Sequence, residues 1–293
     1  MISRLQAFAL IFLAVMLWGW APVGTRYMLG NDHAALPWAA FTGLRYGLAA
    51  FCFLPWLLRA LRRWPRRELM FAAFCGLTGV TSYNLAYAFG SRTVSAGMVG
   101  LITATEPLLI VLLISLRNRR LPGGWTVLAG LTGFAGIALL AGSAGPAQGD
   151  WLGMALVLFA AFTWAWYCVL TPPLLAGRPA VEVSAVTMTG GGVPLLLAGA
   201  RQMPHLLTQM DPPRWAIVLG LVFGPSVLAM VAWNKGTSAL GPEASGWFLY
   251  LLPLVALGGG ALLLGEKLTL MELAGGVLIL LSVFLSQRAP ARV

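Results

Sequence analysis

Arg45 and Glu106 are ionisable residues that fall near the centres of long apolar stretches in this sequence of 293 residues. If those stretches cross a bilayer, the helical rise of ~1.5 Å per residue places the two side chains at similar depths below the same face. A charged side chain at the bilayer centre costs at least about 2.5–3.5 kcal/mol. We therefore expect the two residues to form an ion pair, which is either structural or part of a substrate or proton site.

Aromatic and amide side chains inside similar stretches form a second candidate group. The aromatic members are Trp18, Tyr83, Tyr87, Trp164, Trp233, Trp247 and Tyr250. Two amides, Asn84 and Asn234, lie beside these rings in the sequence. An apolar pocket lined by aromatic rings binds a ring-bearing molecule by stacking and burial, so the group predicts a substrate-binding cavity. Helix packing for the rings, and hydrogen bonds between helices for the amides, are the alternative reading.

Other kinds of chemistry find little support in the sequence. Its two histidines and three cysteines show no spacing that suits a metal ion or a disulfide framework. The sequence contains neither the glycine-rich loop that cradles ATP phosphates nor a hydrolase or metalloprotease motif. We therefore predict no catalytic residue, no metal and no cofactor, and an intramembrane enzyme is poorly equipped.

The elements that must position the candidate residues are transmembrane helices. Apolar residues make up 59% of the chain, charged residues 10%, and the mean hydropathy is +0.83, whereas a soluble domain carries about 25% charged residues. About 20 apolar residues are needed to cross a bilayer. Ten runs meet this length, at about 5–28, 36–58, 68–90, 94–116, 123–142, 151–172, 181–200, 214–236, 244–264 and 270–288. We expect an all-α integral membrane protein whose loops are too short for a soluble domain.

The net charge of +10 is explained by membrane topology rather than by nucleic acid. With a cytoplasmic N-terminus, thirteen Lys and Arg residues lie on the cytoplasmic side and five on the other. An excess of this kind marks the cytoplasmic side of membrane proteins. We expect both termini in the cytoplasm, contact with membrane lipid, and no nucleic-acid partner.

An internal repeat appears when the sequence is shifted against itself by 146 residues. The shift places Trp18 on Trp164, Tyr87 on Trp233 and Pro107 on Pro253. The predicted units are residues 1–146 and 147–293, with five spans each. Because five is odd, the second unit enters the membrane with inverted orientation. Secondary transporters use such inverted repeats for alternating access.

The same residues resemble the drug/metabolite transporter superfamily and, within it, the ten-helix family of paired EamA domains. The similarity is strongest from Pro253-Leu254 through Leu264-Gly265-Glu266 to Gly275-Gly276. The first half has Glu106-Pro107-Leu108 at the matching place, with Arg119-Arg120 where Gly265-Glu266 stand. This resemblance implies two inverted five-helix repeats around a central cavity, with spans 5 and 10 at its periphery.

Two shorter stretches resemble the bacterial aromatic amino acid exporters of this superfamily, at residues 161–168 and 232–236. The resemblance implies a secondary transporter that exports amino-acid-like metabolites, aromatic ones first, across the bacterial inner membrane. It implies a small-molecule substrate, and a monomer is the default expectation. An exporter of cationic drugs, with Glu106 as the counter-charge, is the alternative, because aromatic rings also bind cations.

Overall fold

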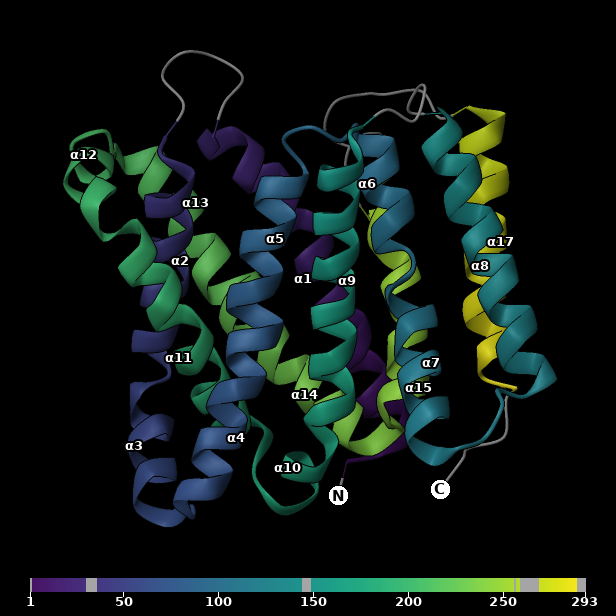
Figure 1. The fold of residues 1–293 in the computed structure, drawn as a ribbon, viewed down its shortest axis with the longest axis horizontal. Coiled ribbons are helices and arrows are strands. Elements are labelled where there is room, and N and C mark those ends of the chain that lie inside the picture. Colours follow the sequence, from purple (N-terminus) through teal and green to yellow (C-terminus); the bar gives the residue numbers. More distant parts are fainter. Residues whose placement is uncertain (1, 30–35, 144–148, 256, 259–268, 289–293) are drawn as a thin grey trace. The chain divides into compact units, whose positions relative to one another are not determined.

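Helices make up nearly all of the computed structural model, which describes residues 2–29, 36–143, 149–255, 257–258 and 269–288 (Figure 1). Within these ranges, Val94 and Gly149 form an isolated antiparallel β-bridge. The all-helical class predicted from the sequence is confirmed.

Seven helical stretches within the described residues are long and apolar enough to cross a membrane. A bent pair, α2 (Trp38–Cys52) and α3 (Leu54–Arg63), raises the number to eight if the 60° bend lies within one span. These eight correspond to the first eight predicted runs. The ninth run extends into residues outside the described ranges, and the tenth contains α17 (Leu270–Ser286), a shorter apolar helix. Ten spans therefore remain a prediction.

The chain divides into two compact units, each built from two segments. Unit 1 comprises Met1–Thr81 and Leu170–Ala239, and unit 2 comprises Ser82–Val169 and Leu240–Val293. In addition to α2 and α3, unit 1 contains α1 (Arg4–Leu29), α4 (Arg66–Gly76), η1 (Leu77–Ser82, ending on the first residue of unit 2), α10 (Pro172–Gly177), α11 (Ala180–Gly199), η2 (Ala200–Gln202), α12 (Met203–Thr208), α13 (Pro212–Leu221), η3 (Val222–Leu228) and α14 (Ala229–Leu240). In addition to α17, unit 2 contains α5 (Tyr83–Gly90), α6 (Ala96–Thr103), α7 (Glu106–Asn118), α8 (Gly124–Ser143), α9 (Trp151–Leu170), α15 (Pro242–Gly246) and η4 (Trp247–Leu251). Each unit combines parts of both predicted repeats, whose boundaries stay a prediction.

Glycines bring the backbones of α2, α4 and α11 into close contact within unit 1. A Cβ at Gly192 would lie 2.7 Å from the carbonyl oxygen of Tyr46 in α2. One at Gly190 would lie 2.6 Å from the Cα atom of Ala73 in α4, and one at Gly76 would overlap the carbonyl oxygen of Thr187 in α11. In lipid there is no hydrophobic driving force for helices to associate, because the lipid chains are as apolar as the side chains. Close van der Waals contact of this kind therefore holds membrane helices together.

In unit 2, α8 and α17 pack side by side through a reciprocal glycine contact (Figure 1). A Cβ at Gly136 would lie 2.7 Å from the carbonyl oxygen of Gly275, and one at Gly275 would lie 2.8 Å from that of Gly136. The Ser282 hydroxyl donates a hydrogen bond of 2.6 Å to the carbonyl oxygen of Ala129. Thr269 begins α17 with a capping box to Glu272, which satisfies free N–H groups of the first turn.

Two wide π-helical turns interrupt the helices at positions that match under the 146-residue shift. The shift moves η1 onto residues 223–228, within one residue of the start of η3. It also moves α8 onto residues 270–289, which begin at the first residue of α17. A duplicated sequence predicts this agreement, while the inverted orientation of the second repeat stays a prediction.

Gly76→Ala should destabilise unit 1 by about 1–3 kcal/mol, because the added methyl group forces the α4 and α11 backbones apart. Gly220→Ala, in α13 of the same unit, is the matched control, since nothing lies within 4 Å of a Cβ there. Alanine favours a helix over glycine by roughly 0.5–1 kcal/mol. Melting temperatures in detergent should therefore fall for Gly76→Ala and hold or rise for Gly220→Ala. Equal melting temperatures would contradict the packing of α4 on α11.

Candidate functional site

Three predicted aromatic residues form one cluster in unit 2. Tyr83 and Tyr87 lie one turn apart on α5, with ring centroids 5.8 Å apart and an interplanar angle of 16°. Trp164 of α9 meets Tyr83 edge-on at 6.1 Å. On its other side Trp164 stacks on Tyr167 at 5.2 Å. Tyr167 is fully buried and was not predicted, although its position three residues after Trp164 puts it on the same helix face.

Glu106 adds a carboxylate to this cluster. It begins α7 after a break at Ala104 and Thr105 that separates α7 from α6. Its side chain is 4% exposed, and the Tyr83 hydroxyl donates a hydrogen bond to it. Tyr87 also lies within electrostatic range of the carboxylate. The unit therefore holds a buried acid beside a set of aromatic rings, which we call the Glu106 cluster (Glu106, Tyr83, Tyr87, Trp164 and Tyr167).

A second cluster forms in unit 1 at the π-helical turn η3. The rings of Trp18 in α1 and Trp233 in α14 lie 5.3 Å apart. The indole N–H of Trp18 donates to the carbonyl oxygen of Pro225 at 2.9 Å. The Nε atom of Arg45 donates to the Ser226 hydroxyl, also at 2.9 Å. Pro225 and Ser226 were not singled out in the sequence, because nothing in its apolar pattern marks a π-helical turn.

The predicted pairing of Arg45 with Glu106 stays a prediction, because the two residues belong to different units. Each has another contact within its own unit. The Arg45 guanidinium lies 5.0 Å above the ring of Tyr46 and donates to Ser226. Glu106 accepts from Tyr83. Neither side chain therefore depends on the other for all of its polar contacts.

The two predicted amides differ in burial. Asn234 is fully buried in α14, and its amide donates to the Ser184 hydroxyl of α11 at 2.9 Å. The Ser184 hydroxyl contacts the carbonyl oxygen of Met230 at 3.5 Å. Asn84 is half-buried in α5. The contacts of Asn234 fit a hydrogen bond between helices.

Trp247 and Tyr250 of η4 both contact α8. Their ring centroids lie 5.9 Å apart, and the Tyr250 hydroxyl donates to the carbonyl oxygen of Gly130 at 3.4 Å. The Trp247 ring lies 3.4 Å from where a Cβ of Gly130 would be. Their predicted place in a substrate cavity stays a prediction.

No group of three or more His, Cys, Asp and Glu side chains that could hold a metal ion occurs in the described part of the chain.

Comparison with known protein families identifies the family to which the chain belongs. The sequence matches the EamA-like transporter family twice, over residues 5–142 and 151–287. The chain belongs to the EamA-like transporter family. Membership confirms the family predicted from the sequence and indicates a multi-pass membrane transporter rather than an enzyme.

Named relatives of this EamA-family transporter include two bacterial proteins. The chain is 32% identical over 239 residues to a "probable terminal-alkyne amino-acid exporter" of Streptantibioticus cattleyicolor, covering 78% of this chain and 76% of that protein. It is 25% identical over 292 residues to a "probable amino-acid metabolite efflux pump" of Escherichia coli, covering 94% and 93%. A crystal structure 20% identical in sequence superposes with a TM-score of 0.76 over 98% of both chains, which shows the fold alone.

Asn234→Leu should lower stability by roughly 0.6 kcal/mol, with an upper bound near 1.7, the range measured for hydrogen bonds between membrane helices. Ser184→Ala should cost a similar amount, and the double variant little more, because both changes remove one interaction. Melting temperatures in detergent of the wild type, the two single variants and the double variant give the coupling energy between the two side chains. Transport should survive in each variant. Loss of transport by Asn234→Leu at unchanged stability would instead identify a substrate contact.

Proposed function

We propose that this EamA-family transporter exports amino acids or amino-acid-like metabolites, ring-bearing ones first, across the inner membrane. The names of two relatives support the substrate class, since one is a probable amino-acid exporter and the other a probable amino-acid metabolite efflux pump. The residues that resemble aromatic amino acid exporters, at 161–168 and 232–236, support the preference for a ring. Stretch 161–168 includes both Trp164 and Tyr167 of the Glu106 cluster.

The observation that carries the proposal is the carboxylate of Glu106 among aromatic rings. An ionised carboxylate has about four lone-pair sites, and the Tyr83 hydroxyl fills one of them. An ammonium group supplies three N–H donors and a charge that aromatic faces attract. The ring of the same substrate gains from stacking on Tyr87 or Trp164 beyond the burial of its area. A small molecule with both a ring and an ammonium group therefore suits this cluster.

Alternating access is the transport mechanism that we infer. Two family matches, over 5–142 and 151–287, support two repeats, and the matching π-helical turns support repeats of similar structure. An odd number of spans in each repeat would invert one relative to the other, so that the two could exchange conformations. Breaks such as Ala104–Thr105 and η3 free carbonyl groups near the two clusters, where a helix can change its bend.

The same carboxylate favours one alternative, a transporter of cationic drugs. A quaternary ammonium ion binds aromatic rings strongly but has no N–H group to donate to Glu106. The two functions therefore differ in whether the substrate needs a hydrogen-bonding ammonium group.

Purified protein in proteoliposomes should transport aromatic amino acids in preference to aliphatic ones, and cells that express it should resist a toxic aromatic analogue. A panel of amino acids and quaternary ammonium drugs, with and without a pH gradient, measures the preference and any proton coupling. Transport of the drugs and of no amino acid would contradict the proposal and support the alternative.

Glu106→Gln should leave the melting temperature near that of the wild type and reduce transport roughly ten- to hundredfold, because a charged hydrogen bond contributes about 1.5–3 kcal/mol. Glu182→Gln is the matched control. Glu182 is 6% exposed in α11 and accepts from the Trp64 indole at 2.9 Å, a bond that glutamine can keep. Transport should survive in the control.

Glu106 would instead be structural if the predicted ion pair with Arg45 holds. Glu106→Gln would then leave Arg45 uncompensated and lower the melting temperature and folding yield, while the protein that survives still transports. Measuring both quantities on one preparation separates the two roles, and a variant that changes neither quantity contradicts both.

A further inference from the structure

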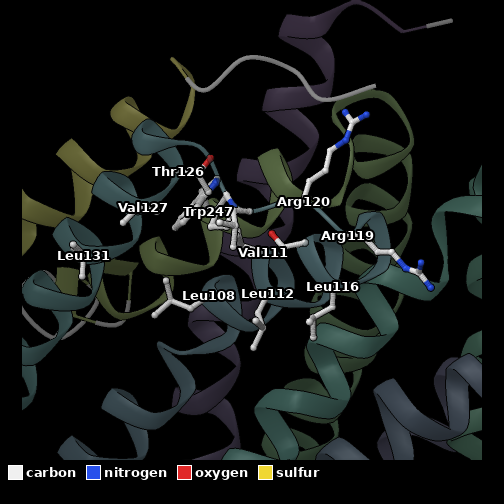
Figure 2. A pocket seen from close by; sticks show the side chains of 13 residues that line it. Leu108, Val111, Leu112, Leu116, Arg119, Arg120, Thr126, Val127, Leu131 and Trp247 are labelled. Atoms are coloured by element: carbon white, nitrogen blue, oxygen red, sulfur yellow. The ribbon is translucent and has the colours of Figure 1, made fainter.

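A groove of about 510 Å³ lies within unit 2 between α7 and α8 (Figure 2), and its lining includes no residue of the Glu106 cluster. It is lined by Leu108, Val111, Leu112, Ser115, Leu116, Arg119, Arg120, Leu121, Pro122, Thr126, Val127, Leu131 and Trp247. The volume is within the range of small-molecule sites, ~300–1,000 Å³. Its lining is apolar apart from Ser115, Thr126 and two arginines, which follow the last residue of α7.

The apolar part of the groove is long and open. Leu108, Leu112 and Leu116 recur every fourth residue on α7, which spans about 12 Å along the helix, and Figure 2 shows them in a row. Leu112 is 51% exposed and Leu116 65%, and Leu131 of α8 is 66% exposed. Trp247 forms a buried wall. This length is similar to the depth of one leaflet, which is about half of the ~30 Å hydrocarbon core.

The arginines lie where a lipid headgroup would be. They stand in the short connection between two candidate spans, Gly97–Asn118 and Gly124–Gly142, and this connection must lie at a membrane surface. Arg119 and Arg120 are both exposed, and within the described residues neither forms an ion pair. The Thr126 hydroxyl, by contrast, already donates to Glu243 at 3.0 Å. The polar end of the groove therefore presents two unneutralised positive charges.

Arg119 occupies a backbone position that favours glycine. Its φ angle of 52° is left-handed, and it ends α7 with a hydrogen bond from its N–H to the carbonyl oxygen of Leu116. Glycine is the usual residue at such a helix end because it has no Cβ to strain the backbone. The residue 146 positions later is Gly265. The first half of the chain therefore has a positive charge where the second half has the residue that suits this backbone position.

We propose that this groove binds one anionic phospholipid, with its phosphate on Arg119 and Arg120 and an acyl chain along the leucines of α7 and α8. Guanidinium groups match phosphate oxygens in a two-pronged geometry, and the apolar track keeps the chain in hydrocarbon. A soluble anion would use the arginines alone, and a zwitterionic lipid would bring no net charge. The site does not depend on which substrate the transporter carries.

Lipid binding to the purified protein in neutral detergent tests the site, by native mass spectrometry with phosphatidylglycerol and phosphatidylcholine. The wild type should prefer phosphatidylglycerol. Each arginine near an anionic headgroup contributes roughly fivefold in affinity, so Arg119→Gly with Arg120→Gln should weaken phosphatidylglycerol binding ~25-fold. Replacing both with lysine should weaken binding less than the Gly/Gln change, because the charge is kept while the two-pronged geometry is lost. Because glycine suits the left-handed position, the double variant should melt no lower than the wild type without lipid.

Two further variants test the groove itself and the specificity of the charge effect. Leu112→Trp fills the apolar track and should weaken binding of the lipid with both arginines intact. Arg62→Gln with Arg63→Gln removes two exposed charges from α3 of unit 1 and should change nothing. The proposal would be overturned if the Arg119/Arg120 variant or the Leu112 variant bound phosphatidylglycerol as tightly as the wild type. It would also be overturned if the α3 control lost as much affinity as the Arg119/Arg120 variant, or if glycerol phosphate, which has no acyl chains, bound as tightly as phosphatidylglycerol.

Discussion

The absence of water from hydrocarbon is the constraint on which the rest of this structure depends. A polar group buried among apolar helices must find its partner in the protein, because each unsatisfied group costs several kcal/mol. The interrupted helices show how the chain meets this demand. At η3 the Pro225 carbonyl accepts from Trp18 and the Ser226 hydroxyl accepts from Arg45. At η1 the Thr81 hydroxyl donates to the Gly191 carbonyl at 2.6 Å. At both π-helical turns, polar side chains thus meet backbone or hydroxyl groups of a neighbouring helix.

Close backbone packing fixes those interrupted segments in place. In unit 1, Gly190 and Gly192 admit α4 and α2 to within van der Waals contact of α11. Gly191 has no side chain, so η1 lies close enough to α11 for the Thr81 hydroxyl to reach the Gly191 carbonyl. In unit 2, Tyr83 follows directly after η1, and Glu106 follows the break at Ala104 and Thr105. Helix breaks therefore position the acid and the phenol that donates to it, and the rings of Tyr87 and Trp164 pack against the ring of that phenol.

The apolar runs and the family could be predicted from the sequence, because both depend on composition and on residues that recur at fixed spacing. Three aromatic members of the Glu106 cluster, Tyr83, Tyr87 and Trp164, were singled out for the same reason, whereas Tyr167 was not. The hydrogen bond from Tyr83 to Glu106 was not, since it depends on side-chain directions at a break that hydropathy does not reveal. Pro225 and Ser226 were missed because a π-helical turn results from packing between helices. The place of Trp247 and Tyr250 in a cavity stays a prediction, since sequence position alone does not decide which side of a helix faces a cavity.

In the proposed function, Glu106 and its aromatic neighbours recognise an ammonium group attached to a ring. Equilibrium binding of two matched compounds to the purified protein tests it most directly. Phenethylamine carries a ring and an ammonium group without a carboxylate, and 3-phenylpropionate carries a ring and a carboxylate without an ammonium group. Our account predicts that phenethylamine binds more tightly by roughly tenfold or more, the value of about 1.5–3 kcal/mol for a charged hydrogen bond. It predicts further that Glu106→Gln removes the difference. Equal binding of the two compounds, or a preference for 3-phenylpropionate, would contradict it.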